Sequence, residues 1–167
     1  VVCIGDSITH GRTSSDYVGM LRRRFQAKGY CFVNAGVNGD MAYHVLQRLD
    51  MVAACRPSFV TLMVGTNDVY AALSTANAHE AMEKMGLPER PTRAFLESRC
   101  NGPRRSFGEY RDGMGLAVKA RRFLLGQSFD AIARRNGFCL LTDFFHLNDT
   151  GAGLVADAVA EFISAGE

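Results

Sequence analysis

Residues 1–8 read VVCIGDSI, and the type of sheet can be inferred from them. Its apolar residues run up to Gly5 without alternation, which is typical of a strand buried on both faces of a parallel sheet. An aspartate and a serine follow directly, where the strand gives way to the next element. In parallel sheets, ligands bind beyond the carboxyl ends of the strands. The stretch therefore predicts such a sheet with Ser7 at the edge where ligands bind.

Outward from this stretch, the chain alternates between strand-like and helical periods. Asp16 is a candidate N-cap, and apolar residues then recur at helical spacing until Gly29 ends the pattern. Such alternation predicts βαβ units, and thus an α/β fold with helices on both faces of the sheet, in one domain over residues 1–167. The predicted strands are residues 1–4, 30–35, 59–64 and 138–142, and the predicted helices are residues 16–28, 41–52, 123–135 and 154–163.

Composition and charge indicate which classes of binding partner the sequence does not favour. The formal net charge is +2, so nothing in the electrostatics favours a nucleic-acid partner. Two basic stretches, residues 22–24 and 121–122, fall inside helical patterns, and we interpret them as solvated helix faces. No apolar run approaches the roughly 20 residues that span a bilayer, so no membrane span is expected, and no signal peptide is evident.

The five cysteines are scattered, odd in number and without a CxxC pair. This pattern indicates neither a disulfide framework nor a zinc site, and it favours a reducing, cytoplasmic location. The chain opens on Val1 inside an apparent strand and without a methionine, so we expect that residues upstream have been removed.

Four short segments after predicted strands carry the candidate chemistry. Ser7 supplies a hydroxyl, Gly39 allows close backbone approach to a ligand, and the Asn67 amide is a possible oxyanion donor. Asp143 precedes His146 by three residues, a spacing that lets the carboxylate hold one imidazole nitrogen while the other faces the ligand. Taken singly, each has a structural alternative: a helix cap, a turn glycine, a capped turn and a structural histidine. Together they are the parts required for acyl transfer.

These segments resemble the SGNH (or GDSL) hydrolase family, which is named for a Ser, a Gly, an Asn and a His in four blocks. Here Ser7 stands in GDSI, Gly39 in NAGVNGD, Asn67 in VGTND and His146 in DFFHLND, with Asp143 three residues before the histidine. The resemblance covers residues 1–72 and 138–164. It implies a three-layer α/β/α, flavodoxin-like fold, and esterase, lipase or carbohydrate-deacetylase activity on a small-molecule ester without a metal or other cofactor.

The resemblance also implies a role for each residue. Ser7 would be the nucleophile, His146 its general base, and Asp143 the group that fixes the imidazole. The Ser7 N–H, the Gly39 N–H and the Asn67 side chain would form the oxyanion hole. We interpret two further aspartates as residues that hold the turns of the site, namely Asp6 and Asp68.

The chain departs from the family in its middle. The family places another helix and strand between the GTND block and the Asp-x-x-His segment, whereas residues 74–114 show no convincing strand. Either the central strands pair directly, or a stretch is missing, and our candidate junction is Ser98–Pro103. An intact mass equal to the calculated 18.3 kDa would contradict a missing stretch. Residues 104–127 are predicted to lie beside the site, where they either shape the substrate pocket or only pack.

Three other classes of protein fit the sequence less well. A metal-dependent phosphoesterase would need more metal ligands than these turns supply. A phosphate- or flavin-binding module would need the lysine of a P-loop or a GxGxxG turn, and neither is present. The last alternative is a non-catalytic relative that binds a ligand, which the intact Ser7, Asp143 and His146 disfavour. Because no long apolar lid is evident, the sequence favours small acyl groups.

Overall fold

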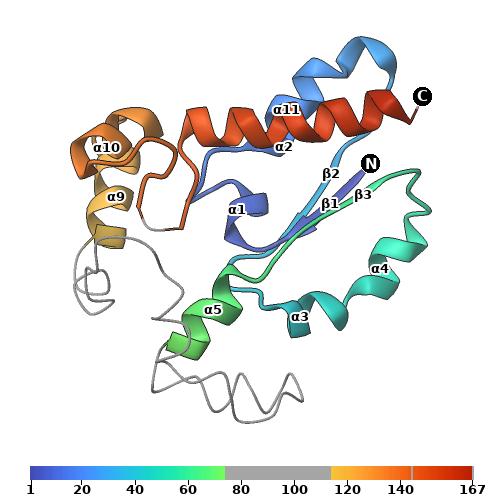
Figure 1. Ribbon diagram of the computed structural model, residues 1–167, viewed down its shortest axis with the longest axis horizontal. Coiled ribbons are helices and arrows are strands. Elements are labelled where there is room, and N and C mark those ends of the chain that lie inside the picture. Colours follow the sequence, from blue (N-terminus) through green and yellow to red (C-terminus); the bar gives the residue numbers. More distant parts are fainter. Residues whose placement is uncertain (74–113, 144, 167) are drawn as a thin grey trace.

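The computed structural model describes residues 1–73, 114–143 and 145–166. At its centre lie three parallel strands, β1 (Val2–Gly5), β2 (Val33–Gly36) and β3 (Val60–Met63), in the order β2-β1-β3 (Figure 1). β1 is the middle strand, and its four residues are all buried. The order 2-1-3 is the one that two consecutive βαβ crossovers of flavodoxin-like type produce.

Helices cover both faces of this sheet. α2 (Tyr17–Arg24) and α11 (Asp149–Ala165) lie on one face, and α3 (Ala42–Leu46) and α4 (Leu49–Ala54) lie on the other (Figure 1). Alternate residues of β1 point to the two faces: Cys3 packs in one core cluster with residues of α2 and α11, while Ile4 packs in another with residues of α3 and α4. The chain therefore has the predicted three-layer α/β/α fold.

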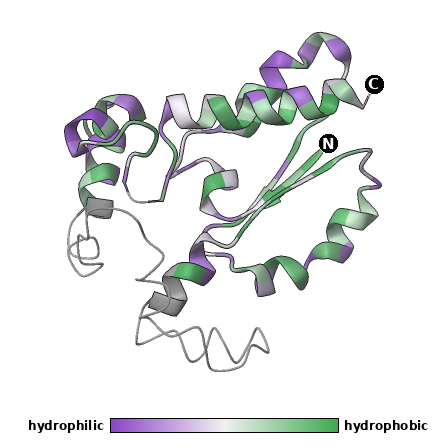
Figure 2. Cartoon of the chain, in the orientation of Figure 1, coloured by the Kyte–Doolittle hydropathy of each residue, from purple (hydrophilic) through white to green (hydrophobic). Residues whose placement is uncertain are grey.

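The strands carry the apolar residues that drive this packing. Figure 2 shows β1 and β3 as largely hydrophobic, whereas α10 (Phe129–Asn136) is largely hydrophilic. A third small core joins α10 to α9 (Met114–Phe123) through Val118, Phe129 and Ile132. This cluster lies apart from the sheet, at the end of the molecule that carries α9 and α10 (Figure 1). No described helix is both long enough and apolar enough to cross a membrane.

Three of the predicted helices are interrupted. The helix predicted over residues 16–28 is α2 followed by a short 3-10 helix, η1 (Gln26–Lys28), and Phe25 between them is buried in the core beside the sheet. Residues 41–52 form α3 and α4 instead of one helix, and residues 123–135 contain the end of α9 and most of α10. The closing helix is longer than predicted, since Asn148 caps α11 by accepting the N–H of Gly151.

The strand predicted over residues 138–142 is wrong. This segment turns back on itself, because the Thr142 N–H donates to the His146 carbonyl at 2.8 Å and the Asn148 N–H donates to the Leu140 carbonyl at 3.0 Å. The only strand-like pairing of the segment within the described residues is one antiparallel bridge between Leu141 and Leu147. A local turn has therefore taken the hydrogen bonds that an added strand would have given to the sheet.

The outer edge of β3 has no partner strand among the described residues. Two apolar side chains of β3 are also exposed, Val60 at 46% and Leu62 at 62%. Within the described residues the sheet therefore stops at β3, beside which the resemblance to the family implies a further strand. Our candidate junction for a missing stretch, Ser98–Pro103, lies outside the described residues.

Candidate active site

Ser7 lies at the first position of α1 (Ser7–His10), directly after β1. Asp6 caps this short helix, since its Oδ1 accepts the Ile8 N–H at 2.9 Å. Gly5 is required before it, because a Cβ at this position would lie 2.3 Å from the Met63 carbonyl oxygen of β3. The close contact between β1 and β3 and the tight turn after Gly5 therefore fix where the serine hydroxyl stands.

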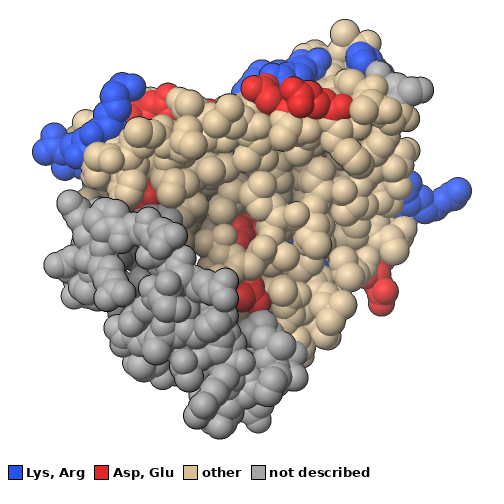
Figure 3. Space-filling view, in the orientation of Figure 1, with Lys and Arg blue, Asp and Glu red and all other residues tan. Residues whose placement is uncertain are grey.

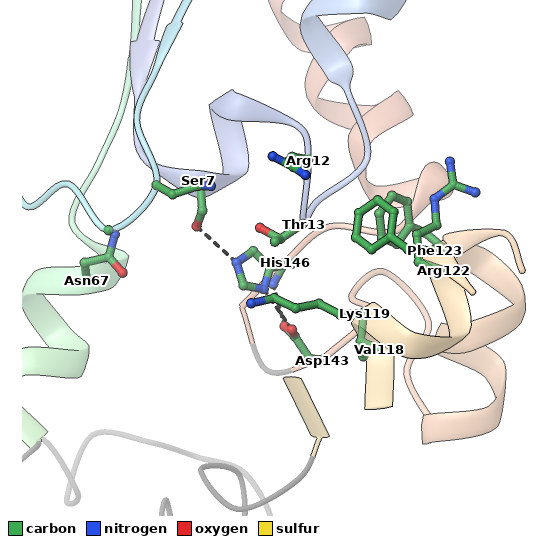
Figure 4. A pocket seen from close by; sticks show the side chains of 13 residues that line it. Ser7, Arg12, Thr13, Asn67, Val118, Lys119, Arg122, Phe123, Asp143 and His146 are labelled. Atoms are coloured by element: carbon green, nitrogen blue, oxygen red, sulfur yellow. Dashed lines mark hydrogen bonds and ion pairs between the residues drawn. The ribbon is translucent and has the colours of Figure 1, made fainter. Parts of the chain in front are cut away.

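His146 and Asp143 complete a chain of hydrogen bonds with this serine. The Ser7 Oγ lies 3.0 Å from His146 Nε2, and His146 Nδ1 lies 2.8 Å from Asp143 Oδ2 (Figure 4). The histidine thus has one nitrogen on the carboxylate and the other on the hydroxyl, the orientation that the three-residue spacing predicted. The structure brings these three side chains together, although 136 positions or more separate Ser7 from its two partners.

A second set of hydrogen bonds holds the loop that contains His146 close to Ser7. The Leu147 N–H donates to Ser14 Oγ at 3.0 Å, and the Ser15 N–H donates to the Leu147 carbonyl at 2.9 Å. Ser15 also donates its hydroxyl to Asp149 Oδ1 at 2.6 Å. These bonds tie the loop after α1 to the residues that flank His146. Sequence reasoning missed these contacts, because serines in a loop are common and their partners are far along the chain.

Burial alone would raise the pKa of Asp143, whose side chain is 3% exposed. The His146 hydrogen bond and charge, together with the N–H groups of Phe145 and His146 on Oδ1, outweigh burial, so the pKa of Asp143 lies below its ordinary value. The opposite holds for Asp6: burial raises the pKa of its carboxyl, and the Ile8 N–H only partly offsets this. The pKa values of Asp143 and Asp6 are therefore shifted in opposite directions.

The predicted oxyanion donors, Gly39 and Asn67, line the same cavity as Ser7. Gly39 has φ of +83°, a conformation that favours glycine, and a Cβ there would meet nothing within 4 Å. The Asn67 Nδ2 donates to the Asp40 carbonyl at 2.8 Å, which leaves its second hydrogen for another acceptor. Asn67 is the second residue of α5 (Thr66–Leu73), which follows β3 closely, so the end of β3 determines where Asn67 lies.

Arg48 holds the backbone around these donors, and sequence reasoning missed it. Its Nε donates to Asp40 Oδ2 at 2.8 Å, while its other nitrogens donate to the Ala35 carbonyl at 2.7 Å and the Gly5 carbonyl at 3.0 Å. One guanidinium therefore joins the ends of β1 and β2 to the segment that carries Gly39. The sequence offers no distinguishing sign, because an arginine among apolar helix positions is usually a solvated residue.

Asp68 holds another turn. Both of its carboxylate oxygens lie 3.1 Å from the Ala42 N–H, at the first residue of α3. Asp68 and Asp6 thus each accept a backbone N–H at the start of a helix. Among the described residues, no group of three or more His, Cys, Asp or Glu side chains is arranged to hold a metal ion.

The cavity has a volume of about 310 Å³ and extends from Ser7 to α9 and α10. Of the segment predicted to lie beside the site, residues 114–127 are described, and α9 forms one wall of the cavity through Val118, Lys119, Arg122 and Phe123 (Figure 4). Residues 104–113 lie outside the described residues. Arg122, which we interpreted as part of a solvated face, therefore lines the cavity, and so do Arg12 and Thr13 from the loop after α1.

Charge on the rest of the molecule is mixed. On the face seen in Figure 3, acidic side chains over α11 lie beside basic ones, and neither sign covers the face. The four described cysteines are all free, and only Cys3 is buried.

Known proteins resemble this chain in sequence and in fold. The model of the GDSL-like Lipase/Acylhydrolase family matches residues 3–154. No curated protein matches the chain. Solved structures match it over almost its whole length, as the following two examples show.

An acetyl xylan esterase, AlAXEase, is 18% identical with a TM-score of 0.56, over 97% of this chain and 98% of that one. A lipase/acylhydrolase from Enterococcus faecalis is 20% identical with a TM-score of 0.52, over 98% of this chain and 94% of that one. At these identities the likeness shows the fold, while the family match covers most of the sequence, motifs included. The chain belongs to the GDSL-like, or SGNH, family of lipases and acylhydrolases.

Proposed function

We propose that this chain is a serine esterase that hydrolyses carboxylic esters through Ser7, His146 and Asp143. The observation that carries the proposal is the unbroken chain of hydrogen bonds from Asp143 Oδ2 through the imidazole to the Ser7 Oγ, at 2.8 and 3.0 Å. These distances lie within the range in which a base accepts a proton from a nucleophile. Family membership supports the same class of reaction.

The first half of the reaction forms an acyl-enzyme. His146 Nε2 accepts the Ser7 proton as the Oγ attacks the ester carbonyl, and Asp143 stabilises the imidazolium without taking its proton. The Ser7 N–H, the Gly39 N–H and the Asn67 Nδ2 receive the oxyanion, and losing one such donor costs roughly 10²–10³ in kcat. The imidazolium then protonates the leaving alcohol, and the acyl group stays on the serine.

The second half repeats these steps with water. His146 accepts a proton from the water that attacks the acyl-enzyme, and the carboxylic acid leaves as the proton returns to Ser7 Oγ. No group outside the chain is required for this balance: one ester and one water give one alcohol and one acid. The cavity of about 310 Å³ suits a small acyl ester.

The test is hydrolysis of p-nitrophenyl acetate by the intact chain and by Ser7→Ala. Turnover should fall by at least 10³-fold in the variant, because only the oxyanion donors and binding remain. Ser164→Ala is the matched control, since Ser164 is an exposed serine near the end of α11 and far from the cavity. Equal turnover in both variants would contradict the proposal. A folded chain that turns over no ester would instead be the non-catalytic, ligand-binding relative.

A further inference from the structure

The cavity beside Ser7 has a cationic wall. Its described lining includes Arg12 from the loop after α1, and Lys119 and Arg122 from α9 (Figure 4). Among the described lining residues, Asp143 alone carries a carboxylate, and its Oδ2 is bound to His146. The cavity therefore holds three cations that the proposed hydrolysis does not use.

Two of these cations have no anionic partner in the described part of the chain. Arg12 and Lys119 are both exposed, and no described carboxylate forms an ion pair with either. Arg122 is held differently: its Nη1 donates to the Gln127 carbonyl at 3.2 Å, and its Cζ lies 4.8 Å from the centre of the Phe129 ring. Arg122 is therefore fixed in place, while no described carboxylate neutralises the charges of Arg12 and Lys119.

The position of these cations relative to Ser7 and His146 indicates which part of an ester they would bind. The oxyanion donor Asn67 is drawn on one side of Ser7, while His146 and the cations are drawn on the other (Figure 4). The base that takes the serine proton later gives it to the leaving oxygen, so the alcohol part of the ester lies on the histidine side. The cations thus lie where the alcohol leaves.

We infer that the preferred esters have an alcohol part that carries an anionic group, phosphate or carboxylate. This inference rests on the proposed esterase function and adds the class of substrate. Guanidinium and ammonium groups bind both anions, the guanidinium with two parallel hydrogen bonds. The anionic group itself does not react: the ester C–O bond breaks, His146 protonates the alcohol oxygen, and the alcohol leaves with its phosphate or carboxylate intact.

The test holds the acyl group constant and varies the charge of the alcohol. Four acetates are compared by titrating the acid that they release: 2-acetoxyethyl phosphate, 3-acetoxypropanoate, neutral 2-methoxyethyl acetate and cationic acetylcholine. At low ionic strength kcat/KM for an anionic acetate should exceed that for the neutral one by about tenfold, the combined effect of two exposed ion pairs of ordinary strength. The preference should shrink as added salt screens the exposed charges.

Substitutions in the cationic wall test whether its side chains cause the preference for anionic esters. Lys119→Met and Arg12→Gln remove one charge each and keep most of the side chain, so each should lower the ratio of anionic to neutral kcat/KM severalfold. Arg122 is not substituted, because it also holds Phe129. Arg23→Gln is the matched control, since this arginine is exposed on α2 and does not line the cavity, and it should leave the ratio unchanged.

The possible failures are distinguishable. Turnover that depends on Ser7 but shows no preference for either anionic acetate would overturn the inference and leave the esterase proposal standing. A ratio that falls equally in Arg23→Gln and in the two wall variants would also overturn it, because the effect would then come from net charge. No turnover of any of the four acetates by folded protein would overturn the esterase proposal and the inference with it.

Discussion

Asp143 shows how one residue serves both the fold and the proposed chemistry. Its Oδ2 holds the imidazole of His146, and its Oδ1 accepts the backbone N–H groups of Phe145 and His146. The turn that these amides form is also the reason why residues 138–142 do not continue as a strand. The same carboxylate therefore shapes the loop and orients the histidine on it.

Asp143→Asn separates these two roles. An asparagine oxygen can still accept the backbone amides, but its amide group cannot accept the Nδ1 proton, so the imidazole loses the tautomer that accepts a proton from Ser7. We expect kcat for p-nitrophenyl acetate to fall roughly 10³–10⁴-fold, with the fold retained. Asp157→Asn, on the exposed face of α11, is the control for the loss of one negative charge. A kcat for Asp143→Asn within threefold of the parent would show that Asp143 has no part in the reaction.

At the scale of elements, the first turn of α11 sets the position of the histidine loop. A Cβ at Gly151 would lie 2.3 Å from the Leu140 carbonyl oxygen and 3.2 Å from Leu147 Cδ2, so this glycine lets the helix pack against the loop backbone. Gly153, one half-turn further along the same helix, faces open space. Substitution of Gly151 therefore tests both close packing and helix propensity, whereas substitution of Gly153 tests helix propensity alone.

Gly151→Ala should therefore displace residues 140–147, because a backbone atom cannot move aside as a side chain can. We expect the free energy of unfolding to fall by about 1–3 kcal/mol, as is usual for overpacking, and kcat to fall with it. Gly153→Ala should instead raise the free energy of unfolding by about 0.5–1 kcal/mol and leave kcat unchanged, since alanine favours the helix. Urea unfolding and ester hydrolysis measure both. Equal effects of the two substitutions would contradict this account of α11.

Over the whole molecule, the sequence predicted what depends on local pattern and strand order. The first three strands, the parallel sheet and the helical layers were predicted from the apolar runs and their spacing, and the structure brings Ser7, Asn67, Asp143 and His146 to one cavity. What failed depends on hydrogen bonds that the apolar pattern of the sequence does not show. Residues 138–142 have the composition of a strand, but the turn at Asp143 takes their hydrogen bonds.

The cavity wall shows the same limit. Arg12, Lys119 and Arg122 look like ordinary solvated basic residues in the sequence, because nothing local reveals that a loop after the first strand and a helix near residue 120 border one cavity. Arg48 is likewise recognisable only from the three backbone and side-chain groups that it joins. Side chains that act through tertiary contacts leave little trace in a single sequence.

The stability of the whole molecule should depend on pH through the two oppositely tuned aspartates. Asp143 has a lowered pKa, so its contribution is present above the ordinary carboxyl range and is lost as the pH falls through its folded pKa. Asp6 has a raised pKa, and its buried Oδ2 has no hydrogen-bond partner in the described structure. Its ionisation therefore destabilises the fold, and this cost is fully present once the pH exceeds the raised pKa.

Asp6→Asn removes that cost while its side-chain oxygen can still cap α1. At pH 7 the variant should have a higher free energy of unfolding than the parent. The difference should shrink as the pH falls towards and below about 4, the ordinary carboxyl pKa, where Asp6 of the parent is protonated in both states. Asp143 is common to both proteins and cancels in the comparison. Urea unfolding at several pH values measures the difference, and a difference that does not change with pH would contradict a raised pKa at Asp6.

Covalent labelling shows whether Ser7 is the nucleophile. The intact chain is treated with a fluorophosphonate, its mass is measured, and the labelled peptide is sequenced. We predict one adduct per chain on Ser7, absent from Ser7→Ala, retained in Ser164→Ala and formed much more slowly in Asp143→Asn. Folded protein that takes up no label, or that carries it on another residue, would contradict the assignment of Ser7 and the mechanism built on it.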